Sequence, residues 1–269
     1  LPPAIWRHRS TLTDLQVFVA NSIVSPASTL LGWFGSAWIA VRLATWFDQV
    51  LGRPTDPLSW SLAATAGCTV GLLVVRDGAH FFNHWLHHKV PLLWPLHAVH
   101  HSAQVMTPLT LYRKHPLYDV VKKLIEAPLV GVFQAVVLFA FGGHFDVWTV
   151  AGVNGLHGLF LLAGSNVRHS HIWIDWGPWL DRLLISPAMH QVHHSPDPRH
   201  VDRNFGSILS VWDLALGTIY VPEGPEVLEF GLGEELGQPH DGLLRAWLGP
   251  LRDMVAIARG RPSSVGRPE

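Results

Sequence analysis

Long apolar stretches set the strongest constraint on how this chain can fold. Residues 15–47, 58–75, 127–141 and 147–167 are almost free of charged side chains. A helix that rises ~1.5 Å per residue needs about 20 such residues to cross a bilayer. The first stretch is too long for one crossing, so we expect Pro26 to separate an interfacial helix from a span over residues 28–47. The chain is therefore predicted to be an all-α integral membrane bundle with about four transmembrane helices.

The composition agrees with a membrane protein. Charged residues make up 14% of the chain, against about 25% in soluble domains. The formal net charge of -1 gives no electrostatic basis for binding nucleic acid. The single cysteine, Cys68, lies in an apolar stretch, which excludes a disulfide framework and a thiolate metal site.

Short connections between the spans predict two hairpins and an orientation. Residues 48–57 join the first two spans, and residues 142–146 join the last two. Of nineteen lysines and arginines, only Arg53 lies in these connections and Arg42 lies within a span. Basic segments stay on the cytoplasmic side of a membrane. We therefore expect residues 76–123 and 168–269 to share that side and to form a cytoplasmic helical cap.

Eighteen histidines are present, and eight of them form three clusters within these two cap segments. Each cluster has i, i+3 or i+4 spacing, which places its members on one face of a helix. Neutral imidazole is a common metal ligand, and eight are too many for one ion but suit two. The eight are His84, His88, His97, His100, His101, His190, His193 and His194. The sequence thus predicts a site for two metal ions at one end of the bundle.

Other histidine chemistries lack their motifs here. The H-E-x-x-H pattern of zinc proteases is absent, and so is the Glu-x-x-His pattern of soluble di-iron bundles. A membrane protein that binds metal without catalysing a reaction remains an alternative, although its histidines should line a path through the bilayer. A zinc hydrolase or lyase on the same scaffold is a further alternative, and it lacks an obvious general-base glutamate beside the clusters.

Two segments carry a resemblance to a known family. They read "RDGAHFFNHWLHHKVPLLWPLHAVHHS", at residues 76–102, and "SPAMHQVHHSPDPRHVDRNFG", at residues 186–206. Together they resemble the fatty acid hydroxylase / sterol desaturase superfamily of integral-membrane di-metal oxygenases, with all three histidine motifs in order. The resemblance implies that the eight clustered histidines bind the metals. It also implies a further histidine about twenty residues before the third motif, where both His169 and His171 stand.

Several neighbours are expected to support these ligands. Asp77 and Asn204 match the family pattern, and His80 lies one helical turn before His84. Ligating histidines commonly donate their second ring N–H to a carboxylate. Among Asp77, Asp175 and Asp202, we expect Asp77 to have this role. The tryptophans that flank the motifs, such as Trp94, are expected to anchor at the membrane interface, and the lining of a lipid entry is the alternative.

The resemblance also implies an activity and its cofactors. Such enzymes activate O2 at two irons and hydroxylate or desaturate a lipid C–H bond, in a fatty acyl chain, sterol, alkylglycerol or similar lipid. Zinc cannot change oxidation state, so iron is expected in the working enzyme, and zinc is an alternative occupant after isolation. No haem, flavin or nicotinamide motif is visible, so electrons should come from a separate cytochrome b5-, ferredoxin- or reductase-type partner. Hydroxylation is the simpler outcome and is preferred.

Three parts of the chain follow from these expectations. Residues 1–27 are predicted to form an N-terminal tail and interfacial helix, and residues 28–222 the membrane-embedded di-metal oxygenase domain. Residues 223–269 are predicted to form a C-terminal cytoplasmic extension. Its end, "ARGRPSSVGRPE", is rich in Pro, Gly, Ser and Arg, and is expected to be disordered.

Overall fold

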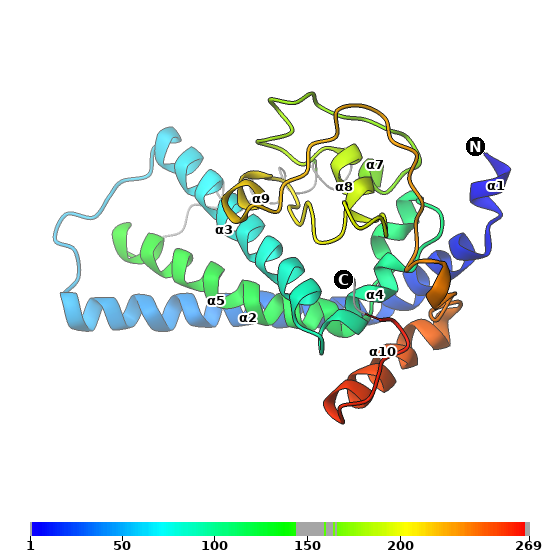
Figure 1. Ribbon diagram of the computed structural model, residues 1–269. Helices are drawn as coiled ribbons and strands as arrows, with labels where there is room; N and C mark the ends of the chain where they lie inside the picture. The colour runs from blue at the N-terminus through cyan, green and yellow to red at the C-terminus, as the bar shows by residue number, and fades with distance from the viewer. Residues whose placement is uncertain (1, 144–158, 160–163, 165, 267–269) are drawn as a thin grey trace.

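A computed structural model describes residues 2–143, 159, 164 and 166–266. Over these ranges the regular elements are helices, apart from one isolated antiparallel bridge between Leu184 and Leu209. The long helices are α2 (Arg9–Leu51), α3 (Leu62–Lys89) and α5 (Pro116–Ala140). The shorter ones are α1 (Pro3–Trp6), α4 (Trp94–His101), η1 (Pro108–Tyr112), α7 (Asn166–Arg168), α8 (Pro187–His193), α9 (Val211–Leu216), η3 (Glu234–Leu236) and α10 (Leu243–Ala258). The predicted all-α class is confirmed for this part of the chain (Figure 1).

Helices α2 and α5 pack side by side and run in the same direction, and α3 packs on α5 and crosses back obliquely (Figure 1). Small residues let α2 and α5 approach closely, since a Cβ added at Gly131 would lie 2.9 Å from the Ser36 carbonyl oxygen. At the far end, the Leu58 N–H donates to the Ala140 carbonyl at 2.9 Å. This hydrogen bond ties the connection before α3 to the end of α5, away from the histidine motifs.

Helix α2 continues through Pro26, so the predicted division of the first stretch is wrong. The 43 residues of α2 form one uninterrupted helix, about 65 Å long at ~1.5 Å per residue. Around the proline, the hydroxyls of Ser28 and Thr29 both donate to the carbonyl of Ser25, at 2.9 and 3.2 Å. In apolar surroundings a full break would leave more backbone groups unpaired than one proline does, so the helix persists.

Three helices, α2, α3 and α5, are long and apolar enough to cross a membrane. Helix α3 begins at Leu62, later than the expected residue 58, and continues to Lys89, so it carries the first histidine motif on its last turns. Helix α5 begins at Pro116, well before the expected residue 127. The first predicted hairpin is thus observed. The fourth predicted span, residues 147–167, lies almost entirely outside the described residues, so four spans remain a prediction.

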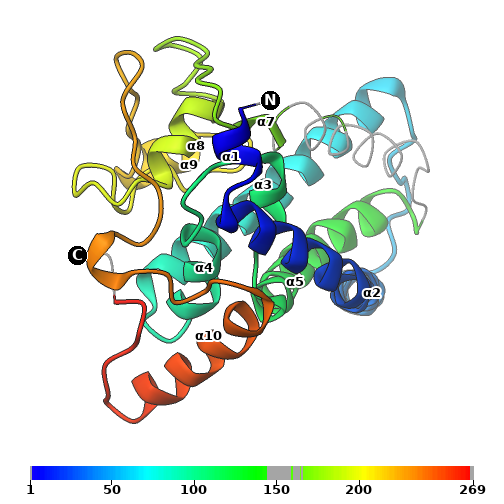
Figure 2. The same ribbon diagram turned by 90° about the vertical axis from the view of Figure 1, so that its right-hand side faces the viewer.

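The short helices gather at the end of the bundle where α3 finishes. In Figure 2, α2 is seen nearly along its axis, and α10 lies across the view beside α4. The chain after α10 folds back against the second motif: Val265 is 1% exposed and packs on Trp94 and Ala98. Asp253 accepts hydrogen bonds from the Ser264 backbone N–H and hydroxyl, at 2.7 and 2.8 Å. As far as Gly266, these contacts hold the segment beside α4 and α10.

Candidate metal centre

Three helices bring the eight clustered histidines together. The first motif lies at the end of α3, the second forms the last turns of α4, and the third lies on α8. Helix α8 begins at a well-formed cap, where the Ser186 hydroxyl accepts from the Met189 N–H and Pro187 takes the first helical position. All eight imidazoles are buried, so the spacing in the sequence does place each motif on one inward face.

The histidines form two adjacent groups, and in each group the candidate ligand atoms lie within 4.8 Å of one another. The first group is His84, His88, His97, His101 and His193. The second group is His100, His169, His190 and His194. His169 directly follows α7 and is the ninth member, whereas His171 is exposed and lies outside both groups.

The spacing of the Nε2 atoms fits nitrogens arranged around shared cations. His169 Nε2 lies 2.8 Å from His190 Nε2 and 3.2 Å from His100 Nε2. In the first group, His101 Nε2 lies 3.1 Å from His97 Nε2 and 3.2 Å from His88 Nε2. A neutral imidazole has only one N–H, so it cannot donate to every such neighbour. Metal–nitrogen bonds of about 2.0–2.1 Å place adjacent nitrogens roughly 3.0–3.4 Å apart, close to the observed spacing.

Burial keeps the ligand rings in their neutral form. Desolvation lowers the pKa of His97, His100 and His101 well below the ordinary value, and the neighbouring imidazoles lower it further. The pKa of His193 falls to about 3, also mainly through burial. Neutral imidazole is the form that binds a metal. The donor set is therefore ready to receive a cation at neutral pH without first losing protons.

Backbone carbonyls fix the orientation of two rings. The Nδ1–H of His84 donates to the Phe205 carbonyl at 2.8 Å, and that of His193 donates to the Arg203 carbonyl at 2.6 Å. Both contacts leave Nε2 facing the group. Asn204, between the two carbonyls, is left-handed with φ of 56°. Its amide donates to the Met189 carbonyl at 3.0 Å. Asn204 thus supports the site through the backbone.

The three candidate carboxylates have different surroundings from those expected. Asp202 Oδ1 lies 3.3 Å from His88 Nδ1, so Asp202 is the carboxylate beside a histidine ring. Asp77 accepts from the N–H groups of Ile208 and Leu209, at 2.9 and 3.1 Å, and from Trp212 Nε1 at 3.0 Å. Asp77 therefore fixes the loop after the third motif, and its expected role in orienting a ligand ring stays a prediction.

His80 and Asp175 lie at the edge of the site. His80 is half-buried and lines cavities beside the histidines, and it is in neither group. Asp175 accepts from Gly177 N–H and Trp173 Nε1 in an exposed turn. Neither side chain is fully buried, whereas all nine grouped histidines are.

Aromatic side chains enclose the centre. Phe205 packs against His88 with 5.0 Å between ring centroids, and Tyr118 stacks on His97 at 5.1 Å. Trp94 lies 5.1 Å from His88 and is 3% exposed, so it is a wall of the site and not an interfacial anchor. Trp94 precedes His97 by three residues, and this helical spacing was a usable signal. Tyr118 and Phe205 gave no comparable signal.

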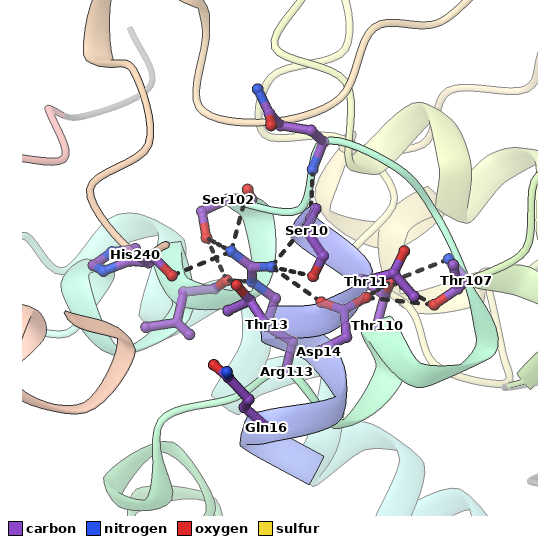
Figure 3. Close-up of polar contacts among 12 residues, drawn as sticks. Ser10, Thr11, Thr13, Asp14, Gln16, Ser102, Thr107, Thr110, Arg113 and His240 are labelled. Carbon is purple, nitrogen blue, oxygen red and sulfur yellow. Dashed lines mark hydrogen bonds and ion pairs between the residues drawn. The ribbon is translucent and has the colours of Figure 1, made fainter. Parts of the chain in front are cut away.

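A buried ion pair ties the second motif to the start of α2 (Figure 3). Arg113 Nη1 lies 3.0 Å from Asp14 Oδ1, and the two side chains are 1% and 0% exposed. Arg113 also donates through Nε to the Val99 carbonyl at 2.9 Å and through Nη2 to the Ser102 hydroxyl at 2.8 Å. Val99 and Ser102 flank the paired histidines of the second motif. The N-terminal part of the chain therefore contributes directly to the support of the centre.

These features define the class of protein: a helical membrane protein with a buried polyhistidine centre at one end of its spans. The sequence model of the fatty acid hydroxylase family matches residues 69–218, more than half of the chain. The chain belongs to this family. The matched residues run from α3 to just beyond α9 and contain all nine grouped histidines.

Curated relatives are similar at low identity. Alkylglycerol monooxygenase from Danio rerio is 28% identical over 161 residues, which cover 60% of this chain and 32% of that protein. The ornithine lipid hydroxylase OlsE from Rhizobium tropici is 25% identical over 211 residues, covering 74% of this chain and 57% of that protein. The chain thus spans about a third to somewhat over half of these relatives' lengths. No solved structure matches it.

Proposed function

We propose that this protein is an O2-dependent hydroxylase of a membrane lipid that holds two iron ions between its histidine motifs. The observation that carries the proposal is the pair of buried histidine groups, with five and four members. Membership of the fatty acid hydroxylase family supports it. The names of both relatives point to hydroxylation of lipids, which favours hydroxylation over desaturation here.

The two groups would each hold one ion. His84, His88, His97, His101 and His193 supply the first donor set, and the second comes from His100, His169, His190 and His194. An all-imidazole set suits iron, zinc and copper. Bound iron supplies the redox chemistry that activates O2, which zinc cannot supply. Our proposal is thus iron in the working enzyme, with zinc as an occupant of the isolated protein.

The overall reaction requires an external reductant. One oxygen atom of O2 replaces the hydrogen of a C–H bond as a hydroxyl group, and the other leaves as water. This balance needs two electrons and two protons, and we assign the electrons to a cytochrome b5-, ferredoxin- or reductase-type protein. The chain's own contribution is to hold the ligand rings through Phe205 and Arg203 and to keep water away with Trp94 and Tyr118.

Metal analysis of purified protein tests the proposal. Protein expressed with iron supplementation should contain about two irons per chain by elemental analysis and Mössbauer spectroscopy. His100→Ala should lose metal and O2-dependent lipid turnover together, because His100 belongs to the second group. His171→Ala is the matched control, since His171 is an exposed histidine outside both groups. Full metal content in His100→Ala, or undiminished turnover without O2, would contradict the proposal.

A further inference from the structure

Three adjoining cavities lead from the membrane-facing side of the long helices to the histidines. The outermost, about 300 Å³, lies between α2, α3 and α5. It shares Arg76, Lys123 and Glu126 with a second cavity of about 70 Å³. The second shares His80 and Ser207 with a third of about 20 Å³. Histidines of both groups line the third cavity, so the innermost of the three cavities lies at the candidate metal centre.

The outer cavity is suited to a hydrocarbon chain. Its apolar lining comes from all three long helices: Trp33, Ala37, Leu72, Ala127 and Val130. Trp33 is 63% exposed and belongs to the face of α2 that carries many exposed apolar side chains. On a membrane-spanning helix such a face meets lipid. A lipid chain can therefore reach this cavity from the bilayer without crossing water.

The inner cavities carry an excess of positive charge. Their lining includes five cationic side chains and two carboxylates. The cations are Arg76, Lys114, Lys122, Lys123 and Arg168. Of the carboxylates, Glu126 pairs with Arg76 at 2.9 Å and with Lys123 at 2.8 Å. Asp77 is occupied by the two backbone N–H groups and the indole described above.

Two lysines lack an anionic partner in this part of the structure. Among the described residues, no carboxylate lies within ion-pair distance of the ammonium of Lys122, which lines the second cavity. The same holds for Lys114, which lines the third. Holding a partly buried ammonium without a counter-ion is costly. An anion bound between these lysines would offset that cost.

The charged residues also lie where the apolar parts of the helices end. Arg76 directly follows the apolar stretch of α3, and Glu126 directly precedes that of α5. Gly32 of α2 lies at the same level, since a Cβ added there would meet Lys123 at 2.7 Å. This is the level at which lipid headgroups meet the hydrocarbon, and basic side chains there attract anionic lipids.

We propose that the three cavities bind a single-chain lipid with an anionic headgroup, a carboxylate or a phosphate. The headgroup lies between Lys122, Arg76 and Lys114, and the hydrocarbon chain occupies the outer cavity. The headgroup end of the lipid is then nearest to the histidines. The assignment of this lipid as a substrate rests on the proposed function, whereas the binding of the lipid does not.

Equilibrium binding of labelled lipids tests the headgroup requirement. The full chain, purified in detergent with its metal, is titrated with radiolabelled oleate and, separately, with 1-oleoyl lysophosphatidic acid. At least one should bind, and the tighter one identifies the headgroup as carboxylate or phosphate. Neutral monoolein, with the same chain, should compete at least tenfold more weakly. Inorganic phosphate alone should not compete, because it lacks the chain. Equal competition by monoolein would overturn the inference.

Substitutions of Lys122 separate charge from packing. Lys122→Gln should weaken binding of the anionic lipid about tenfold, which corresponds to ~1.4 kcal/mol of binding free energy. Lys122→Arg keeps the charge and should bind like the wild type. Binding by Lys122→Gln that equals the wild type would overturn the assignment of the headgroup site.

A second pair of variants tests the path. Another cavity, about 280 Å³, also reaches Lys114, and it is lined by Phe18, Asn21 and Ser22 of α2. Ala37→Trp should obstruct the outer cavity and weaken lipid binding, whereas Ser22→Trp should have no effect. The reverse result would overturn the path.

Oxidation of a neutral lipid by the wild-type enzyme, together with lipid binding that does not depend on headgroup charge, would defeat this inference and leave the proposed function intact. Lipid turnover that no longer depends on bound metal would contradict the proposed function and leave the inferred lipid-binding site intact.

Discussion

His169 and His171 stand two residues apart in surroundings that differ sharply. The ring of His169 is buried against His100 and His190, while His171 is exposed. We predict that His169→Ala lowers the metal content from about two ions per chain to about one, because it removes one of four donors from the second group. His171→Ala should retain both ions. Elemental analysis of the two variants, purified in parallel, measures the metal content. Equal metal content in the two would contradict the assignment of His169 as a ligand.

The Asp14–Arg113 pair should be a second sensitive point. Removing one partner leaves the other charge buried and unpaired, at a cost of about 3–5 kcal/mol. We predict that Arg113→Met lowers the melting temperature in detergent by about 6 °C or more. Arg53→Met is the matched control, because Arg53 is 76% exposed in its pair with Asp48, and such pairs contribute about 0–1 kcal/mol. A similar small shift in both variants would argue against a structural role for the buried pair.

At the residue scale, spacing within a helix was informative and contacts between distant segments were not. The i+3 and i+4 pattern predicted which histidine faces meet, since those positions share one side of a helix. It carried no information on Asp202, which reaches His88 across 114 positions of sequence, or on Arg113, which meets Asp14 across 99. Long-range pairs of this kind depend on how elements pack, so the sequence did not indicate that Asp202 lies beside His88.

At the element scale, Asp77 is the contact that joins α3 to the segment before α9. It accepts from Ile208, Leu209 and Trp212, and those donors lie close after Phe205, whose carbonyl orients His84. We predict that Asp77→Ala leaves three partly buried donors unpaired, each at a cost of up to about 1–3 kcal/mol. Faster hydrogen exchange should appear over residues 203–212. Asp56→Ala, at an exposed position in the α2–α3 connection, is the control.

Protection of residues 203–212 that is unchanged in Asp77→Ala would show that other contacts hold this segment. Asp213 is the competing candidate, because its carboxylate accepts from the Phe205 and Gly206 N–H groups at 2.8 and 2.7 Å. The two carboxylates hold successive stretches of the same segment. For this reason Asp77→Ala should affect residues 207–212 more strongly than residues 203–206.

The elements themselves were predicted in kind but not in extent. Apolar stretches locate the lipid-facing parts of helices, yet α3 and α5 extend well beyond them into polar sequence. In α3 the same helix that can cross the membrane carries His84 and His88, so the first motif is positioned by a long rigid element. The sequence marks where hydrophobicity ends, and helices end only where the backbone pairing ends. Pro26 is a second example, because α2 continues through it although a proline often ends a helix.

For the whole molecule, the arrangement of helices explains why the motifs meet. Helices α2 and α5 lead away from the histidine end and α3 returns to it, so residues 76–123 begin and end there (Figure 1). The distribution of lysine and arginine predicted this common end, since Arg53 alone lies in the opposite connection. It did not predict that the segment after α10 would pack on α4, because that contact depends on Val265 and Trp94 meeting across the fold.

The orientation of the molecule in the membrane is the last prediction. Because basic segments stay in the cytoplasm, the α2–α3 connection should face outside and the segment around η3 should face the cytoplasm. In a Cys68→Ser background, Asp56→Cys and Glu235→Cys place one exposed thiol in each region. In intact bacterial cells that express the protein in the inner membrane, a membrane-impermeant maleimide should label Asp56→Cys directly. It should label Glu235→Cys only after permeabilisation. The opposite pattern would reverse the orientation, and labelling of both from outside would contradict a membrane crossing by α2 and α3. The unsubstituted background should stay unlabelled, which confirms that the signal comes from the introduced thiols.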